Sequence, residues 1–259
     1  MTRTETAIAL ARLRYPQFDS DHLQAFFACR NVFVNDELVT DPHMKIKSDS
    51  DLEIIVNEKY VSRGGLKLEH ALQQFGLDVK DKVMLDAGAS TGGFTDCLLQ
   101  HGALLVHSVD VGYNQLDYSL RKDSRVIVHE RQNIMTMDCL EPIPDMAVAD
   151  LSFRSISGAA SHIMGLVREK LIVALIKPQF EVPKWQVGFD GVVKDPELLR
   201  QVMLNVRRTL EEDGCGICDL SVSPIKGRKG NVEFLGLLRL GTGLSEDEFT
   251  AVVNRLMEN

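Results

Sequence analysis

Four charged residues stand beside apolar segments in a pattern that suits proton transfer. Asp150 follows the segment MAVA, Lys177 follows LIVALI, Glu233 precedes a third apolar segment, and Lys67 lies in a stretch with helical spacing. A neutral lysine amine in a desolvated site can act as a general base toward a hydroxyl group. We assign that role to Lys177. Lys67 would favour the neutral amine by like-charge repulsion, and the two carboxylates would orient the reacting groups. Taken singly, each of the four could also be an ordinary point where the chain meets water.

A glycine-rich segment, VMLDAGASTGGF at residues 83–94, suits close approach to a ligand. Glycine lets the backbone come near a bound molecule, and an open parallel sheet binds ligands at the carboxyl ends of its strands. The pattern is D-x-G-x-x-x-G-G, and the dinucleotide fingerprint G-x-G-x-x-G does not fit. A generic phosphate-binding turn is the alternative interpretation.

Alternating strand and helix patterns predict the elements that position these residues. Strands are expected at residues 83–86, 103–109, 126–129, 146–149, 171–176, 215–223 and 232–240. Helices are expected at residues 66–75, 93–101, 115–121, 155–167, 196–212 and 245–257. This order predicts an α/β fold with a doubly wound, mostly parallel, Rossmann-like sheet. The last two strands have no helix between them and should pair antiparallel, so Glu233 should lie at the same edge as Asp150 and Lys177.

Residues 1–59 predict a separate small α+β domain, followed by a larger domain over residues 60–259. Helices are expected at residues 5–13 and 21–30. Short strands around Val32 to Val39 would be broken by a turn at Asn35–Asp36, and a further strand is expected at Ile46 and residues 52–56. The pair Gly64-Gly65 should break the structure just before the next helix.

The four charged residues match the Lys-Asp-Lys-Glu tetrad of the FtsJ-like ribose 2′-O-methyltransferases, and the glycine segment resembles the first motif of S-adenosylmethionine methyltransferases. Nearly all of residues 60–240 resembles the TlyA branch of that family, often labelled hemolysin. The matching segments are YVSRGGLKLEHAL, LDAGASTGGFTDCLL, VDVGYNQL, ADLSFRSI, IKPQFE, GVVKDP and GRKGNVEF. The small domain resembles an S4 RNA-binding domain through FVNDELVTDP.

This resemblance implies S-adenosylmethionine-dependent 2′-O-methylation of ribosomal RNA, with a cytidine ribose as acceptor and no metal. It implies that Asp86 and the glycine segment hold the methionine end of the cofactor, and that Asp110 binds the ribose hydroxyls. The expected cofactor-binding residues are Asp86, Gly88, Ser90, Thr91, Gly92, Gly93, Phe94, Asp110, Val111 and Asn133, with Gln115 suggested by loop placement.

Several residues near these motifs are candidates for contact with RNA. Arg63, Arg154, Arg228 and Lys229 could bind phosphates, or could be ordinary solvated loop charges. Phe153 and Phe180 could stack on a base, although core packing is the simpler interpretation. Residues 182–190, which contain Trp185, could form a lid or merely a surface loop.

Bulk composition bounds these interpretations. The 259 residues carry a net charge of −8, so any basic face for RNA must be local. No apolar segment approaches the ~20 residues that a membrane helix needs, and no signal peptide is evident. Five cysteines, an odd number, suit a reducing compartment, and we expect a cytoplasmic protein. Cys215 and Cys218 read as core residues rather than zinc ligands.

Three other functions remain open from the sequence. A methyltransferase of the same fold could act on a small molecule, without need of the lysine pair or the small domain. A pore-forming hemolysin would need a membrane-inserting segment, which the sequence does not offer. An RNA-binding protein with an inert catalytic fold would not need the complete tetrad and glycine segment.

Overall fold

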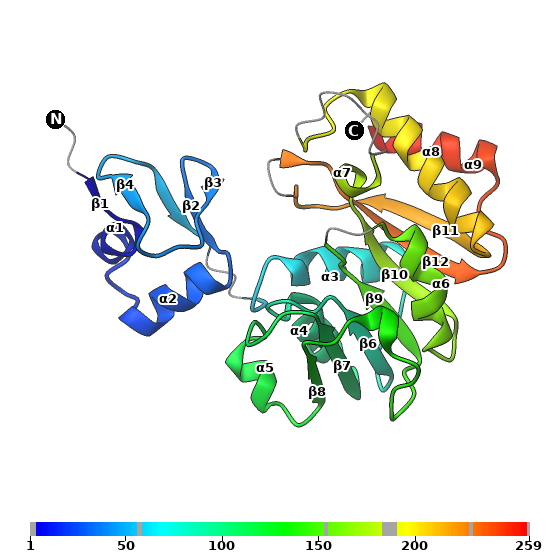
Figure 1. The fold of residues 1–259 in the computed structure, drawn as a ribbon, viewed down its shortest axis with the longest axis horizontal. Helices are drawn as coiled ribbons and strands as arrows, with labels where there is room; N and C mark the ends of the chain where they lie inside the picture. The colour runs from blue at the N-terminus through cyan, green and yellow to red at the C-terminus, as the bar shows by residue number, and fades with distance from the viewer. Residues whose placement is uncertain (1–3, 56–58, 153–154, 183–190, 228–229, 258–259) are drawn as a thin grey trace. The chain divides into compact units, whose positions relative to one another are not determined.

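A computed structural model describes residues 4–55, 59–152, 155–182, 191–227 and 230–257. The chain divides into two compact units, Met1–Arg63 and Gly64–Asn259. Figure 1 shows both units with their helices and strands labelled. Each unit has its own buried apolar core, and the larger one contains all four residues of the tetrad.

The smaller unit combines two helices with two small sheets. Helix α1 spans Ala7–Arg14 and α2 spans Ser20–Ala28. The strands are β1 (Thr4–Thr6), β2 (Val32–Val34), β3 (Glu37–Leu38), β4 (Lys45–Lys47) and β5 (Leu52–Ile54). Strand β1 pairs with β4, and β2 lies between β3 and β5. The turn expected at Asn35–Asp36 is present, and both residues adopt left-handed backbone angles, with φ of 50° and 64°.

Two expectations for this unit were wrong. Residues 4–6 form a strand, whereas a helix was expected from residue 5, because pairing with the distant strand β4 outweighs the local helical spacing. Ile46 and Leu52–Ile54, expected in one strand, belong to β4 and β5, which lie in separate sheets. Both strand pairings join distant segments, so the local residue pattern does not reveal them.

The larger unit is built on a seven-stranded sheet with the order β11-β12-β10-β9-β6-β7-β8. Strand β12 runs antiparallel to both of its neighbours, and every other adjacent pair is parallel. This confirms the predicted α/β class and the antiparallel last strand. The strands are β6 (Val83–Ala87), β7 (Leu105–Asp110), β8 (Val126–Glu130), β9 (Met146–Ala149), β10 (Leu171–Ile176), β11 (Cys215–Val222) and β12 (Phe234–Leu240).

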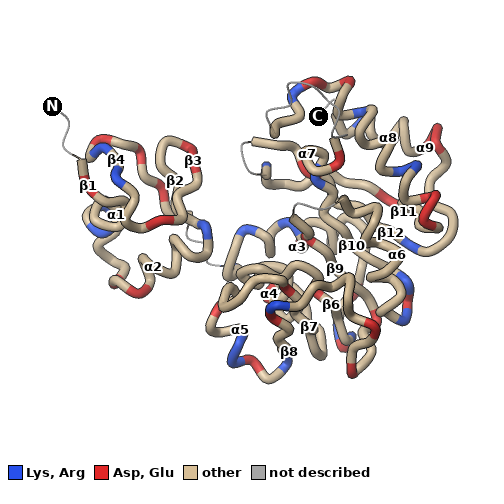
Figure 2. Tube along the Cα trace, in the orientation of Figure 1, with Lys and Arg blue, Asp and Glu red and all other residues tan. Residues whose placement is uncertain are grey.

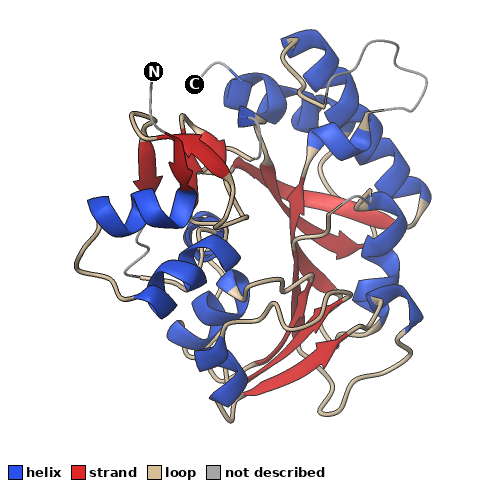
Figure 3. Cartoon of the chain, turned by 60° about the vertical axis from the view of Figure 1, so that its left-hand side comes forward, coloured by secondary structure: helices blue, strands red, loops and turns tan. Residues whose placement is uncertain are grey.

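Helices cover both faces of this sheet, as the edge-on view of Figure 3 shows. One face carries α3 (Gly64–Gln74), α4 (Gly93–Gln100) and α5 (Tyr118–Lys122), and the other carries α6 (Ser157–Gly165), α8 (Pro196–Glu212) and α9 (Glu246–Met257). The short helix α7 (Pro178–Glu181) follows β10 directly. Because both faces of the sheet are covered, the central strands β9 and β10 are apolar throughout rather than alternating.

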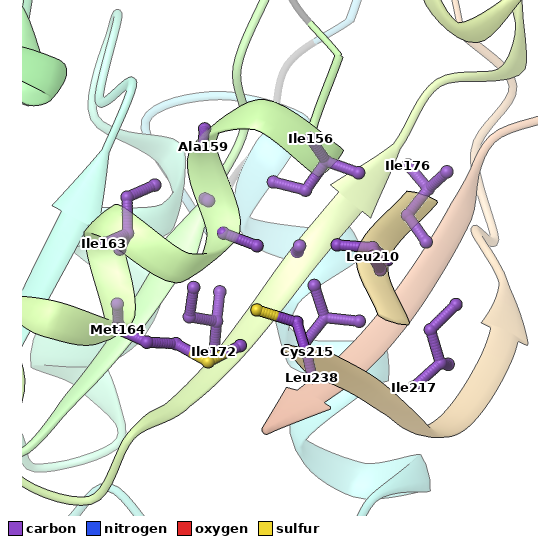
Figure 4. Close-up of a cluster of buried hydrophobic side chains, with 14 of the residues drawn as sticks. Ile156, Ala159, Ile163, Met164, Ile172, Ile176, Leu210, Cys215, Ile217 and Leu238 are labelled. Carbon is purple, nitrogen blue, oxygen red and sulfur yellow. The ribbon is translucent and has the colours of Figure 1, made fainter. Parts of the chain in front are cut away.

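The main core lies between the sheet and the α6–α8 layer. Figure 4 shows Ile163 and Met164 of α6 packed toward Ile172 of β10, with Leu210 of α8 and Cys215 of β11 beside them. Cys215 is fully buried there, as expected of a core residue, whereas Cys218 is half-buried.

Local signals place several helix boundaries correctly. Helix α8 begins at Pro196, with the Asp195 side chain accepting from the backbone N–H of Glu197. Ser245 and Glu248 form a capping box before α9, with the Glu248 N–H donating to Ser245 Oγ at 3.3 Å. The expectation that Gly64-Gly65 breaks the structure was wrong, because α3 begins at Gly64.

Candidate active site

The carboxyl edge of the large sheet brings three of the tetrad residues to one line. Asp150 follows β9 and Lys177 follows β10, while Glu233 immediately precedes the antiparallel β12. Ile176 pairs with Phe234 across β10 and β12, so Lys177 and Glu233 occupy the next positions on neighbouring strands. The direction of each strand therefore accounts for the shared edge.

The tetrad is arranged as two ion pairs. Lys67 Nζ lies 2.6 Å from Glu233 Oε2, and Lys177 Nζ pairs with Asp150 Oδ1. Side-chain exposure is 13% for Lys67, 4% for Glu233 and 10% for Lys177, so these charges are largely withdrawn from water. Burying charge without a partner is expensive, and here each ammonium faces a carboxylate. Each lysine therefore has its own carboxylate partner, a pairing that the expected repulsion between the two lysines did not include.

Further polar groups surround the two pairs. Ser152 Oγ accepts a hydrogen bond from Lys177 Nζ at 3.2 Å, and Gln179 Nε2 lies 3.5 Å from Glu233 Oε1. A Cβ atom at Gly227 would overlap the Glu233 carboxylate, so a side chain at position 227 would have to displace that carboxylate. Sequence reasoning overlooked Ser152, Gln179 and Gly227, although all three lie within the segments that carry the resemblance.

The glycine loop lies against the same edge. Gly88 has φ of +89°, and a Cβ there would lie 2.6 Å from the carbonyl oxygen of Asp150. The N–H of Asp150 in turn donates to the carbonyl of Ala87 at 3.0 Å. These contacts join the loop that follows β6 to the position that carries the Asp150 carboxylate. Any ligand held by the loop therefore lies next to the ion pairs.

Asp86, at the end of β6, is fully buried. Its Oδ2 accepts a hydrogen bond from Thr95 Oγ1 at 2.6 Å, and Thr95 shares a 2.7 Å hydrogen bond with Ser108. Among the described residues no partner reaches Asp86 Oδ1. Burial is the main reason that the pKa of Asp86 is raised to about 7. A buried carboxyl group with an unused oxygen is suited to a donor group on a ligand.

Asp110, at the end of β7, lines a cleft at the carboxyl edge of the sheet. Its two oxygens accept from the backbone N–H groups of Ser90 (2.8 Å) and Gly112 (2.6 Å), which holds the carboxylate at the cleft wall. The lining residues are Ala89, Ser90, Ser108, Asp110, Gly112, Gln115, Leu116, Val128 and Glu130. A carboxylate beside glycine backbone and apolar side chains fits a nucleoside: ribose hydroxyls can donate to Asp110, and Leu116 and Val128 offer an apolar wall.

The expected cofactor residues are distributed unevenly around this cleft. Ser90, Asp110 and Gln115 line it. Phe94 is buried inside α4, Val111 is 70% exposed, and Asn133 instead caps a short 3-10 helix, Ile134–Thr136, by accepting from the N–H of Met135. Glu130 and Ser108 line the cleft without having been expected there. Glu130 ends a strand at the carboxyl edge, which is the same signal that identified Asp110.

Most candidates for RNA contact lie outside the described residues: Phe153, Arg154, Arg228 and Lys229. Of the suggested lid at residues 182–190, only Val182 is described. Arg63 belongs to the smaller unit, where its guanidinium lies 5.4 Å from the Phe33 ring centroid. Phe180 lies with its ring centroid 5.9 Å from Lys177 Nζ.

Within the described ranges, no group of three or more His, Cys, Asp or Glu side chains could hold a metal ion. In the same ranges no helix is both long enough and apolar enough to cross a membrane.

Known proteins resemble this chain in both sequence and fold. A profile of the FtsJ-like methyltransferase family matches residues 60–240. Hemolysin A of Brachyspira hyodysenteriae is 44% identical over 208 residues, which cover 79% of this chain and 87% of the relative. The 16S/23S rRNA (cytidine-2′-O)-methyltransferase TlyA of Mycobacterium tuberculosis (strain ATCC 25618 / H37Rv) is 43% identical over 206 residues, which cover 78% of this chain and 77% of the relative.

A solved structure extends the likeness to the full length. "Putative hemolysin from Streptococcus thermophilus" is 34% identical, with a TM-score of 0.75, and the match covers 100% of this chain and 97% of that one.

Proposed function

Because the chain belongs to the FtsJ-like methyltransferase family, we propose that it transfers the methyl group of S-adenosylmethionine to a ribose 2′-hydroxyl of ribosomal RNA. The observation that carries this proposal is the contact between the glycine loop and Asp150, which brings the cleft lined by Asp110 to the same sheet edge as the two lysine–carboxylate pairs. A methyltransferase that acts on hydroxyl groups needs both parts at one edge of the sheet.

Lys177 is the proposed general base. In its neutral form the amine accepts the proton of the 2′-hydroxyl as the ribose oxygen bonds to the methyl carbon and the bond from that carbon to sulfur breaks. Asp150 and Ser152 hold the lysine nitrogen in place, and Glu233 with Lys67 orients the hydroxyl. Holding the reacting atoms in line supplies much of the rate.

The bound cofactor supplies a methyl group on a positively charged sulfur, which leaves as a neutral thioether, so the chemistry requires no metal. Asp110 would bind the ribose hydroxyls of S-adenosylmethionine, with Ser90, Gly112 and Glu130 around them. Asp86 and the loop at Gly88 would hold the methionine end.

The choice of a ribosomal substrate rests on relatives. Two are named as rRNA (cytidine-2′-O)-methyltransferases, one of them acting on 16S and 23S rRNA and the other on 23S rRNA. We extend cytidine and the ribosomal subunits to this chain as proposed acceptor and partners, which would place the activity in the cytoplasm. Residues 1–59 would act as an S4-like RNA-binding domain, supported by a separate folded unit with its own core.

Two alternatives give different experimental results. A small-molecule methyltransferase would use the cofactor cleft without acting on RNA, and a pore-forming hemolysin would lyse membranes without S-adenosylmethionine. The name hemolysin is carried by relatives, and the described residues offer no specific support for a pore.

The decisive experiment is tritium transfer from labelled S-adenosylmethionine to purified ribosomal subunits, with Lys177→Ala beside the wild type. Alkali-resistant dinucleotides that carry the label, absent from the variant, would establish 2′-O-methylation and the role of Lys177. Full activity of Lys177→Ala would rule that lysine out as the base. If the wild type binds the cofactor but no label enters the RNA, the methyl acceptor is a molecule other than ribosomal RNA.

A further inference from the structure

The segment from Val111 to Tyr118, which follows β7 and ends at the first residue of α5, exposes three large apolar side chains. Val111 is 70% exposed, Tyr113 64% and Tyr118 72%. They are three of the six large apolar side chains that are exposed in the described part of the larger unit, and they lie within eight positions of one another. Single exposed apolar residues are common, but a local group of them often marks a binding surface.

Both tyrosine rings in this group are covered by cations. The Arg131 guanidinium lies 4.1 Å from the Tyr113 ring centroid, and Lys122 Nζ lies 5.4 Å from that of Tyr118. We call these four residues, together with Val111, the β7–α5 rim. Figure 2 shows Lys and Arg positions along α5 and the turn that leads to β8. The rim therefore offers flat apolar faces next to positive charge within a protein of net charge −8.

The Tyr113–Arg131 stack is held by the backbone. The N–H of Arg131 donates to the carbonyl of Gly112 at 2.9 Å, and the N–H of Gln132 donates to the carbonyl of Asp110 at 3.0 Å. Arg131 takes a left-handed conformation with φ of 54°, which lets the chain turn back over the ring. A stack held in this way loses little freedom on binding a ligand.

The rim is also placed near the reaction. Gly112 and Glu130, which line the cofactor cleft, are chain neighbours of Tyr113 and Arg131. Strand β7 is separated from β10, which precedes Lys177, by β6 and β9. Three strand spacings of about 4.8 Å separate β7 from β10, and four separate β10 from β8, which precedes Arg131. The rim therefore lies roughly 14 to 19 Å along the sheet edge from the catalytic lysine, a span of a few nucleotides.

We propose that the β7–α5 rim binds an unpaired base of the RNA strand that carries the target ribose. The base stacks on the Tyr113–Arg131 pair, and Arg131 and Lys122 attract the adjoining phosphates. Aromatic and guanidinium faces are the groups on which unpaired RNA bases stack, and neighbouring cations complement the phosphates. This assignment rests on the proposed function, because it presumes an RNA substrate.

The test measures binding of a fluorescein-labelled single-stranded RNA oligonucleotide of mixed sequence by fluorescence anisotropy, using the full chain. Tyr113→Ala and Arg131→Ala should each weaken binding roughly tenfold, whereas Tyr113→Phe should bind like the wild type. Arg131→Ala should also reduce the slope of log affinity against log salt by about 1. Leu104→Ala and Arg208→Ala, exposed residues away from the rim, are the controls and should leave binding unchanged.

Each outcome decides the assignment. Equal RNA affinity in the wild type and both alanine variants, or no RNA binding by the wild type, would overturn it. Weaker S-adenosylmethionine binding in calorimetry with unchanged RNA binding would instead assign the rim to the cofactor and also overturn it. A wild type that binds RNA through the rim but does not methylate ribosomal subunits would contradict the proposed function alone.

Discussion

Lys67 Nζ lies 2.6 Å from Glu233 Oε2, although 166 positions separate the two residues in the chain. The lysine comes from a helix that precedes the sheet, and the glutamate precedes the only strand that runs antiparallel to its neighbours in the described sheet. The pair thus joins the beginning and the end of the larger unit at the site where we propose that chemistry occurs.

The turn that contains Gly227 controls the position of Glu233. Gly227→Ala would drive a methyl group into the Glu233 carboxylate and displace it from Lys67. A displacement of about 1 Å in a catalytic group can cost roughly a hundredfold in rate, so we expect a loss of that order in methyl transfer with near-normal thermal stability. Gly165→Ala in α6 is the matched control, because an added Cβ there meets nothing within 4 Å. Wild-type activity of Gly227→Ala would contradict the proposed role of Glu233.

The burial of Asp86 should make the free energy of unfolding depend on pH. Burial raises the pKa of Asp86 to about 7, whereas in the unfolded chain the carboxyl group would titrate near its ordinary pKa of 3.8. The folded state therefore binds the extra proton between these values, and the free energy of unfolding should fall as pH rises from about 4 to about 7. At about 1.4 kcal/mol for each pH unit, the total contribution is on the order of 4 kcal/mol.

The Asp86→Asn variant removes this titration and isolates its effect. Urea denaturation at pH 4.5, 6 and 8 should show the variant gaining stability relative to the wild type as the pH rises. Its affinity for S-adenosylmethionine should fall, because the carboxyl group is proposed to hold the methionine end. Asp138→Asn, at an exposed position, is the control. A stability difference that is constant across the three pH values would show that Asp86 is not the titrating group.

We expect Glu181 to act as a positioning residue for the same site. It accepts hydrogen bonds from Ser155 Oγ at 2.5 Å and from the N–H of Ile156 at 2.9 Å, which tie helix α7 after Lys177 to the segment after Asp150. Burial raises the pKa of Glu181, so a neutral glutamine is a close substitute. We expect Glu181→Ala to lower kcat for methyl transfer roughly tenfold.

The contrast with Glu181→Gln separates positioning from stability. The glutamine variant should recover most of the lost kcat, while the dissociation constant of S-adenosylmethionine should stay near that of the wild type in both variants. Glu212→Ala, on the exposed side of α8, is the control. If both Glu181 variants were fully active, or if both lost thermal stability in proportion to activity, the positioning role would be rejected.

Removal of residues 1–59 should separate RNA binding from cofactor binding. The larger unit has its own core and contains both the cleft and the tetrad, so calorimetry should find S-adenosylmethionine binding close to that of the full chain. Affinity for ribosomal subunits, measured by filter binding, should fall at least tenfold, because the proposed RNA-binding domain is lost. A larger loss of cofactor affinity than of RNA affinity would contradict the role proposed for this unit.

Features set by neighbouring residues could be predicted from the sequence. The caps at Asp195 and Ser245, the turn at Asn35–Asp36 and the apolar strands β9 and β10 follow from hydrogen bonding and periodicity over a few positions. The predicted strand directions then place Asp150, Lys177 and Glu233 at one edge of the sheet.

Contacts between distant segments were decided only by the tertiary structure. The sequence identified four charged residues but not which lysine pairs with which carboxylate, because that choice depends on how α3 packs beside β12. Strand β1, the close approach of Gly227 and the Glu181 hydrogen bonds have the same origin. Periodicity and capping are properties of a few adjacent residues, whereas these contacts exist only after non-local packing brings remote segments together.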